Sequence, residues 1–266
     1  MADKAKTKSG PSALKIVLLL LVIAAASPIL VSFVKCPYMG YYKSHMPKMT
    51  GMMEYRAAQA ELKHKSFKIK YDPVPLNSIS TYLRKAAIAA EDDRFYQHNG
   101  FDIEAMKKAY ELNQKRGRTV RGGSTITQQV AKNVWLSPRR SWWRKSVEAV
   151  LAWRMEHTLS KDRILEIYLN IIEWGNGVFG ASAASRIYFG EPPSALTPPQ
   201  AALLAAAIPS PLRSNPAKPS AYLLRRQSII LDRLMGKGKT EELPADEGTT
   251  DDSTPGPVQP KEPGQQ

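Results

Sequence analysis

The longest uninterrupted apolar run lies near the start of the chain. It reads IVLLLLVIAAASPILVSFV over residues 16–34 and contains no charged residue. About 20 apolar residues in a helix cross a bilayer, and a proline such as Pro28 is tolerated in a membrane helix. A cleaved signal peptide is the alternative, with residues 24–26 as a small-residue cleavage site. Because the apolar residues continue to Val34, which makes the run too long for the apolar region of a signal peptide, it predicts an uncleaved membrane anchor.

Helical periodicity dominates from Leu76 to about Met235. Apolar or small residues recur at helical spacing in ISTYLRKAAIAAE, RKSVEAVLAWRMEHTLSKDRILEIYLNIIEW, TPPQAALLAAAIPSP and SAYLLRRQSIILDRLM. No run of alternating strands is present, so any sheet must be small. The pattern predicts a mainly α domain.

Several helix starts can be assigned from their capping residues. Ser160 is a natural N-cap, and Thr197 precedes two prolines that suit a first helical turn. In RGGSTITQQVAKN, Thr125 and Gln128 have the spacing of a capping box. Free N–H groups at such a helix start also suit an anion, so two interpretations remain open: an ordinary capped helix, or a site for a negatively charged group.

These patterns divide the chain into five segments. We expect a cytoplasmic tail at 1–15, a transmembrane anchor at 16–34, a juxtamembrane connection at 35–75 and a folded domain at 76–236. Residues 237–266 are rich in Pro, Gly, Thr, Asp and Glu and have few large apolar residues. Such a composition cannot bury enough surface to fold, so it predicts a disordered acidic tail.

The charge is strongly asymmetric. The chain carries a net charge of +14, and residues from 240 onward contain seven acidic residues and one lysine, which leaves +20 on the rest. A body this basic suits an acidic partner such as nucleic acid, anionic lipid or a phosphate-bearing substrate. Lysines both precede and follow the apolar run, so they favour neither orientation strongly. The short N-terminal segment favours a cytoplasmic N-terminus. Cys36, the only cysteine, excludes an internal disulfide.

Two carboxylates and a group of cations are candidates for chemistry. Glu91 ends an Ala-rich helix, where burial would raise its pKa as a general base requires; a solvated helix end is the alternative. Glu148 is placed for a simple ion pair with Arg144 or Lys145, or for a second catalytic carboxylate. His98 is a candidate proton carrier or a structural histidine. The cations suit either a pyrophosphate or anionic lipid head groups; they are Lys132, Arg139, Arg140, Arg144 and Lys145.

Five ordered segments together resemble the peptidoglycan glycosyltransferases, a lysozyme-like family that polymerises lipid II. They are EDDRFYQHNGFD, GGSTITQQVAKN, RKSVE, KDRILEIYLN and GNGVFGASAASRIYFG. The EWGNGVFG variant is similar to the monofunctional biosynthetic transglycosylases. The resemblance covers roughly residues 70–235 and implies a helical, lysozyme-like domain behind the single anchor. Glu191 stands where the family commonly has lysine, and Ser185 where it has alanine.

The resemblance implies a role for each matching residue. Glu91 corresponds to the base that deprotonates the sugar 4-hydroxyl of the acceptor, and Glu148 to a second carboxylate near the donor pyrophosphate. Lys132, Arg140 and Lys145 correspond to positions that hold that pyrophosphate. Ser124 and Gln129 match polar contacts along the cleft, and Asp92 and Phe95 match positions beside the base.

The same resemblance sets expectations for activity, partners and location. It implies inverting polymerisation of lipid II into β-1,4-linked strands with release of undecaprenyl pyrophosphate, and it allows a divalent cation, Mg²⁺ or Mn²⁺, beside Glu148. The expected partners are lipid II, the growing glycan strand, membrane lipid and other cell-wall synthesis proteins, but no nucleic acid. The expected location is the bacterial inner membrane, with the catalytic domain on the periplasmic side. A lysozyme-like lytic enzyme and an inactive membrane-anchored scaffold are the alternatives.

Overall fold

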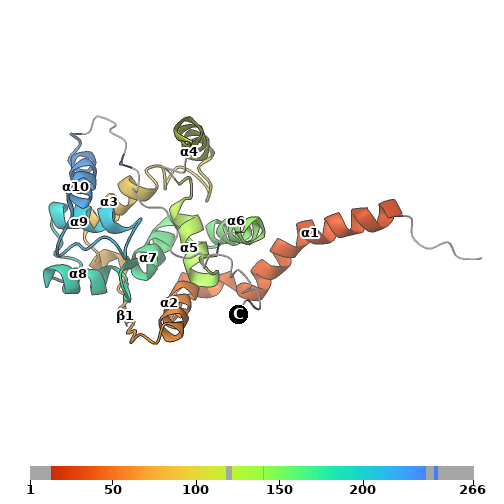
Figure 1. Cartoon of the computed structure of the whole chain (residues 1–266), viewed down its shortest axis with the longest axis horizontal. Coiled ribbons are helices and arrows are strands. Elements are labelled where there is room, and N and C mark those ends of the chain that lie inside the picture. Colours follow the sequence, from red (N-terminus) through yellow and green to blue (C-terminus); the bar gives the residue numbers. More distant parts are fainter. Residues whose placement is uncertain (1–12, 118–121, 140, 238–242, 245–266) are drawn as a thin grey trace, which may run out of the picture.

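The structure, a computed structural model, describes residues 13–117, 122–139, 141–237 and 243–244. The predicted tail at 1–15 and the predicted acidic tail at 237–266 therefore lie largely outside the described residues. Helix α1 (Ala13–Lys35) projects from the globular part of the chain (Figure 1). Within the described ranges it is the one helix long and apolar enough to cross a membrane, as the apolar run predicts.

The globular part is mainly helical, as the periodicity predicts. Its core contains α9 (Pro198–Ala207), which is almost fully buried and packs against α10 (Ala221–Leu234) and α3 (Thr81–Glu91). A second group packs α5 (Ile126–Trp135) against α6 (Trp142–Glu156) and α7 (Lys161–Ile171). The remaining helices are α2 (Gly51–Leu62), α4 (Ile103–Arg116) and α8 (Ala181–Phe189), with short 3-10 helices at Met39–Lys43 and Leu76–Ser78.

The helix starts follow the predicted caps. The Ser160 hydroxyl accepts a backbone N–H at the start of α7, as predicted. Ser80, which was not among the predicted caps, does the same at the start of α3. Thr125 and Gln128 form the expected capping box of α5, and α9 begins at Pro198, directly after Thr197. Helix α3 ends at Glu91. Local sequence therefore determines where the helices that carry the site residues begin.

The sheet is small, as expected. It has the order β1-β3-β2, in which β1 (Lys70–Tyr71) pairs parallel to β3 (Val178–Phe179), and β2 (Glu173–Gly175) pairs antiparallel to β3. The Asn170 side chain on α7 holds the segment that follows β1. Its amide oxygen accepts from the Val74 N–H at 2.8 Å, and its amide nitrogen donates to the Val74 carbonyl at 2.9 Å. The segment at 35–75 thus contributes a helix and a strand that join the folded domain.

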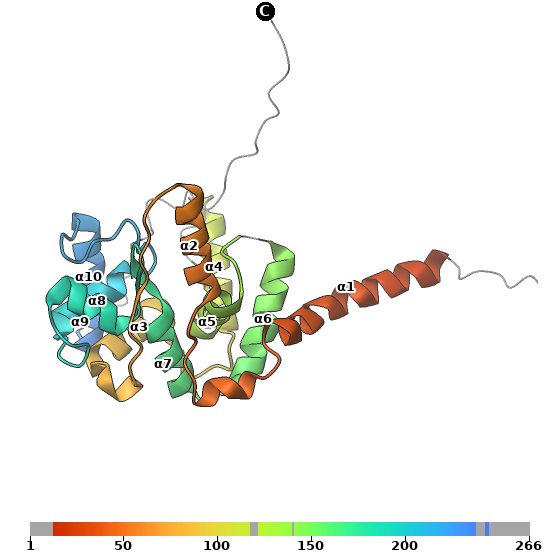
Figure 2. The same ribbon diagram turned by 90° about the horizontal axis from the view of Figure 1, so that it is seen from below.

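Helix α6 holds the end of α1 against the domain. The buried Arg154 guanidinium donates to the Ser32 carbonyl at 2.7 Å and lies 3.8 Å from the Phe33 ring centroid. Trp143 Nε1 donates to Ser27 Oγ at 3.2 Å. The two views show α6 lying across the end of α1, on the side of the globular part from which α1 projects (Figures 1 and 2).

Cys36, at the end of α1, is buried against Met39, with 3.9 Å between the sulfur atoms. A thiol in this position packs as a small apolar group.

Candidate active site

Glu91 is a half-buried carboxylate held by a side-chain amide. Gln129 Nε2 on α5 donates to Glu91 Oε2 at 2.8 Å, and the buried Tyr168 hydroxyl on α7 donates to Gln129 Oε1 at 3.3 Å. Burial raises the pKa of Glu91 above its ordinary value of 4.5, while Gln129, Arg226 and Lys132 partly oppose this rise. The solvated helix end is therefore the wrong interpretation for Glu91. A positioned carboxylate with a raised pKa has the properties of a general base.

Asp92 ties the end of α3 to the start of α5. Its Oδ2 accepts the Ile126 N–H at 3.0 Å, and its Oδ1 accepts from His98 Nε2 at 2.9 Å. Gly100 N–H donates to His98 Nδ1 at 3.2 Å, which assigns the neutral tautomer with its proton on Nε2. His98 is thus structural, and the anion at the start of α5 is the protein's own Asp92. Asp92 directly follows Glu91, and its place in substrate binding stays a prediction.

Phe95 packs beside this pair but is itself fully buried. Its ring meets the His98 ring edge-on, and the Lys161 ammonium lies 4.5 Å from its centroid. Lys161 in turn pairs with Glu156 at 2.8 Å. Phe95 therefore packs against His98 of the Asp92–His98 pair. It has no exposed surface that could contact a substrate.

Glu148 lies at the centre of the cationic group. Its carboxylate is 2 % exposed, and it accepts from Arg144 at 2.8 Å and from Lys145. The Lys145 ammonium also donates to Ser124 Oγ at 3.1 Å, across from α6 to the segment before α5. The predicted ion pair of Glu148 is confirmed for both cations. Its burial shows that the carboxylate holds these two cations in place rather than forming a solvated surface pair.

Lys132 lies within electrostatic reach of both carboxylates. Burial lowers the pKa of Lys132 below its ordinary value of 10.5, while Glu148 and Glu91 both act to raise it. The described residues offer its ammonium no ion pair within 4 Å. A cation that is surrounded by protein yet has no direct counter-ion is available to an incoming anion.

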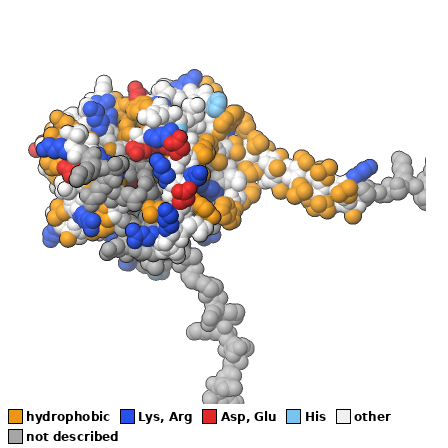
Figure 3. All heavy atoms as spheres, turned by 90° about the horizontal axis from the view of Figure 1, so that it is seen from above, with side chains coloured by type: hydrophobic (Ala, Val, Ile, Leu, Met, Phe, Trp, Pro, Cys, Tyr) orange, Lys and Arg blue, Asp and Glu red, His pale blue; other side chains and the backbone are white. Residues whose placement is uncertain are grey.

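The structure thus brings most of the predicted site residues together. Glu91 and Glu148 both interact with the charge of Lys132, so these three side chains form one electrostatic group. Lys145 and Ser124 extend it further. Arg140 lies outside the described residues. Figure 3 shows acidic and basic side chains gathered on one face of the globular part, beside the base of α1.

A divalent cation does not fit the described residues around Glu148. Both of its carboxylate oxygens already accept hydrogen bonds from cations. The described residues contain no group of three His, Cys, Asp or Glu side chains able to hold a metal. Mg²⁺ and Mn²⁺ take oxygen ligands, and both oxygens of Glu148 are already engaged by Arg144 and Lys145, so no catalytic step is assigned to a metal.

Two contributors to the site come from helices far away in the sequence. Tyr168 orients Gln129, and its own pKa is raised well above 10.0 by burial, which keeps the hydroxyl a donor. The buried Arg226 on α10 lowers the pKa of Glu91. Tyr168 lies within the segment KDRILEIYLN, but nothing in the sequence singled it out as a contact of Gln129. The one signal for Arg226 in the sequence is its place within the amphipathic segment SAYLLRRQSIILDRLM.

The fold and the site together define a class of protein: a helical, lysozyme-like domain on a membrane-type helix, with one positioned carboxylate facing a group of cations. A carboxylate alone would serve hydrolysis, whereas fixed cations stabilise an anionic leaving group. This combination is typical of a transferase that uses a diphosphate-activated donor.

Comparison with known proteins assigns the family. Residues 59–235 match the family described as transglycosylase. A biosynthetic peptidoglycan transglycosylase of Azoarcus sp. (strain BH72) is 44 % identical over 204 residues, which cover 77 % of this chain and 86 % of that protein. The protein of the same name from Thiobacillus denitrificans is 45 % identical over 196 residues, which cover 74 % of this chain and 84 % of the relative. The chain belongs to the transglycosylase family.

Proposed function

We propose that this peptidoglycan glycosyltransferase of cell-wall synthesis polymerises lipid II, with Glu91 as general base and with Lys132, Lys145 and Arg140 as the cations that hold the donor diphosphate. The activity itself follows from family membership and from relatives named biosynthetic peptidoglycan transglycosylase. The observation that carries the residue assignment is the position of Lys132. Its charge interacts both with Glu91 and with the group formed by Glu148, Arg144 and Lys145.

Glu91 activates the acceptor in this proposal. The carboxylate takes the proton of the sugar 4-hydroxyl, and the oxygen forms a bond to the anomeric carbon of the donor. Gln129 donates to one carboxylate oxygen, Oε2, so the other oxygen is the one to receive the proton. Tyr168 holds Gln129 in turn. Such positioning keeps the base within reach of its proton.

The cations stabilise the departure of the donor. As the new bond forms, the bond from the anomeric carbon to the diphosphate oxygen breaks on the opposite face, and its electron pair leaves with the diphosphate. Attack opposite the leaving group inverts the α-linked donor to a β-1,4 bond. Lys132 and Lys145 are in place before reaction, so little reorganisation is needed when negative charge develops. Glu148 keeps Lys145 in position.

The membrane anchor supports a lipid-linked substrate. Helix α1 suggests anchoring, and α6 lies across its end and carries Lys145 and Glu148. We propose that α1 lies in the bacterial inner membrane with the catalytic domain on the periplasmic side, where cell wall is assembled. A lytic enzyme would need a carboxylic acid but no cations for a diphosphate, so the cationic group favours polymerisation.

Purified protein incubated with lipid II tests the proposal. We expect polymer that lysozyme degrades, together with released polyprenyl diphosphate. Mature glycan, incubated separately, should remain uncut. Cleavage of mature glycan without polymerisation of lipid II would overturn the proposal in favour of a lytic enzyme.

A further inference from the structure

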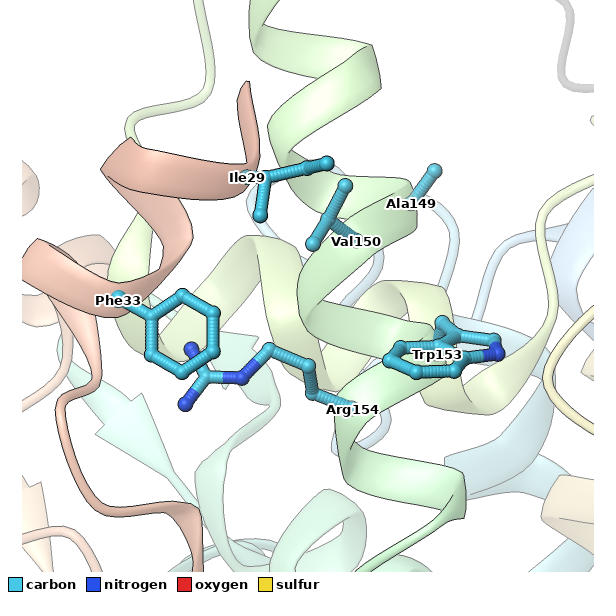
Figure 4. A pocket seen from close by; sticks show the side chains of 6 residues that line it. All are labelled: Ile29, Phe33, Ala149, Val150, Trp153 and Arg154. Carbon is cyan, nitrogen blue, oxygen red and sulfur yellow. The ribbon is translucent and has the colours of Figure 1, made fainter. Parts of the chain in front are cut away.

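An apolar hollow of about 340 Å³ lies where α1 meets α6. It is lined by Ile29 and Phe33 of α1 and by four residues of α6, which are Ala149, Val150, Trp153 and Arg154. Figure 4 shows the Arg154 guanidinium turned toward Phe33, with Ile29 beside Val150 and the Trp153 ring at the edge. Because that guanidinium already donates to the Ser32 carbonyl, the hollow presents mainly hydrocarbon.

The hollow lies at the membrane end of the domain. It begins where α1, the candidate membrane span, reaches the globular part. Trp142, Trp143 and Trp153 of α6 are all at least half exposed, and tryptophan is enriched where protein meets the membrane surface. Figure 3 shows hydrophobic side chains continuing from α1 onto the adjoining surface of the globular part.

The same helix connects the hollow to the cationic group. Lys145, Ala149 and Trp153 follow one another at intervals of four residues on α6, so they lie along one face. At 1.5 Å per residue, about 12 Å of helix separates Lys145 from Trp153. An anion bound at Lys145 therefore stands at one end of a stripe whose other end is the apolar hollow.

We propose that the hollow binds the first isoprene units of the polyprenyl chain on the lipid-linked donor. This inference rests on the proposed function, because it assigns the donor diphosphate to Lys145. A diphosphate joined to a long hydrocarbon chain needs fixed cations followed by an apolar path, and α6 supplies both on one face. The chain leaves the hollow beside α1 and enters the bilayer. Binding of the chain here also fixes the direction from which the diphosphate reaches the cations.

Chain-length preference tests the inference. Wild-type protein should have a higher kcat/KM for a donor with a full polyprenyl chain than for one shortened to a few isoprene units, both in detergent. Ala149→Trp fills the hollow and should lower the ratio of the two values about tenfold, within the range by which apolar pockets discriminate. Leu20→Trp adds the same side chain to exposed α1 far from the hollow and should leave the ratio unchanged. An unchanged ratio in Ala149→Trp, or an equal loss for both donors, would overturn the inference.

Crosslinking gives a second readout that needs no turnover. A sugar-free polyprenyl diphosphate with a photoreactive group in its first isoprene units should label peptides that contain residues 29–33 or 149–154. Unlabelled polyprenyl diphosphate should compete for this labelling, and phosphatidylglycerol should not. Equal competition by phosphatidylglycerol would assign the hollow to ordinary membrane lipid. Labelling at the hollow by a protein that does not polymerise lipid II would refute the proposed function but not the chain site.

Discussion

Replacement of Glu91 by glutamine separates catalysis from folding. Glutamine has nearly the same size and can still accept the hydrogen bond that Gln129 donates at 2.8 Å, but it cannot take a proton. A positioned general base contributes about 10²–10⁴-fold to rate, which corresponds to about 2.7–5.4 kcal/mol of barrier at 1.36 kcal/mol per tenfold change. We therefore expect Glu91→Gln to lose about that factor in kcat with lipid II.

The same substitution should stabilise the fold at neutral pH. Burial raises the pKa of Glu91 above 4.5, so the folded protein holds this proton more tightly than the unfolded chain. The stability associated with the protonated carboxyl is fully present below pH 4.5 and is lost as the pH rises through the raised pKa. Glutamine does not titrate. Glu91→Gln should therefore melt higher than wild type at pH 7, with about 2–4 °C for each kcal/mol gained, and the difference should shrink toward pH 4.5.

Glu91→Asp is the matched control. It keeps a titrating carboxylate but withdraws it by one carbon–carbon bond, about 1.5 Å, and a displacement of that order costs about 10²-fold in rate. The assays are polymer formation from lipid II and thermal unfolding at several pH values. If Glu91→Gln kept more than a tenth of wild-type activity, the catalytic role assigned to Glu91 would be refuted. If it melted lower than wild type at pH 7, the raised pKa of Glu91 would be refuted.

Four further predictions concern the cations and the pH profile. Lys132→Met should lower kcat/KM about 10²–10³-fold, as loss of one preorganised charge does, whereas an exposed-lysine control, Lys107→Met, should change it little. Glu148→Gln removes the charge that holds Arg144 and Lys145, so we expect a loss of about 1–2 kcal/mol in urea unfolding and a larger KM for lipid II; unchanged values would contradict its structural role. The rate should follow a bell-shaped pH profile with an acidic limb above 4.5, from Glu91, and an alkaline limb below 10.5, from Lys132; limbs at or outside these values would show that other groups control the rate. Because Glu148 is already surrounded by cations, removal of divalent ions with EDTA should change the rate less than twofold, and full loss with recovery on adding Mg²⁺ would assign the metal a role.

The sequence predicted the helices well because their signals are local. Thr125 with Gln128, Ser160, and Thr197 followed by prolines each marked a helix start that the structure confirms. The apolar run was equally clear because membrane length and lack of charge are properties of a single segment. Ile103–Arg116, by contrast, has few apolar positions and one buried residue, Ala109, so its periodicity did not identify it as a helix.

Knowledge of the site depended on a different kind of information. Motif order indicated Glu91, Lys132, Lys145 and Glu148, but their spacing was equally compatible with solvated charges. Burial in the tertiary structure shows that Glu91 and Lys132 are not solvated charges, because it raises the pKa of Glu91 and lowers that of Lys132. The contact of Tyr168 with Gln129 and the effect of Arg226 on Glu91 became visible only in the packing of α7 and α10 against the other helices. The roles of Glu91, Ser124, Gln129 and the cations in binding and catalysis stay predictions.

The sequence by itself determined the membrane-type helix, the mainly α domain, the helix caps and the charge excess of the body, because each depends on neighbouring residues along the chain. Only the tertiary structure decided that Asp92 fills the start of α5, that Glu148 is a buried holder of two cations, and that α6 lies across the end of α1. These features depend on which side chains lose contact with water when distant helices pack together, and that loss sets both their charges and their available partners.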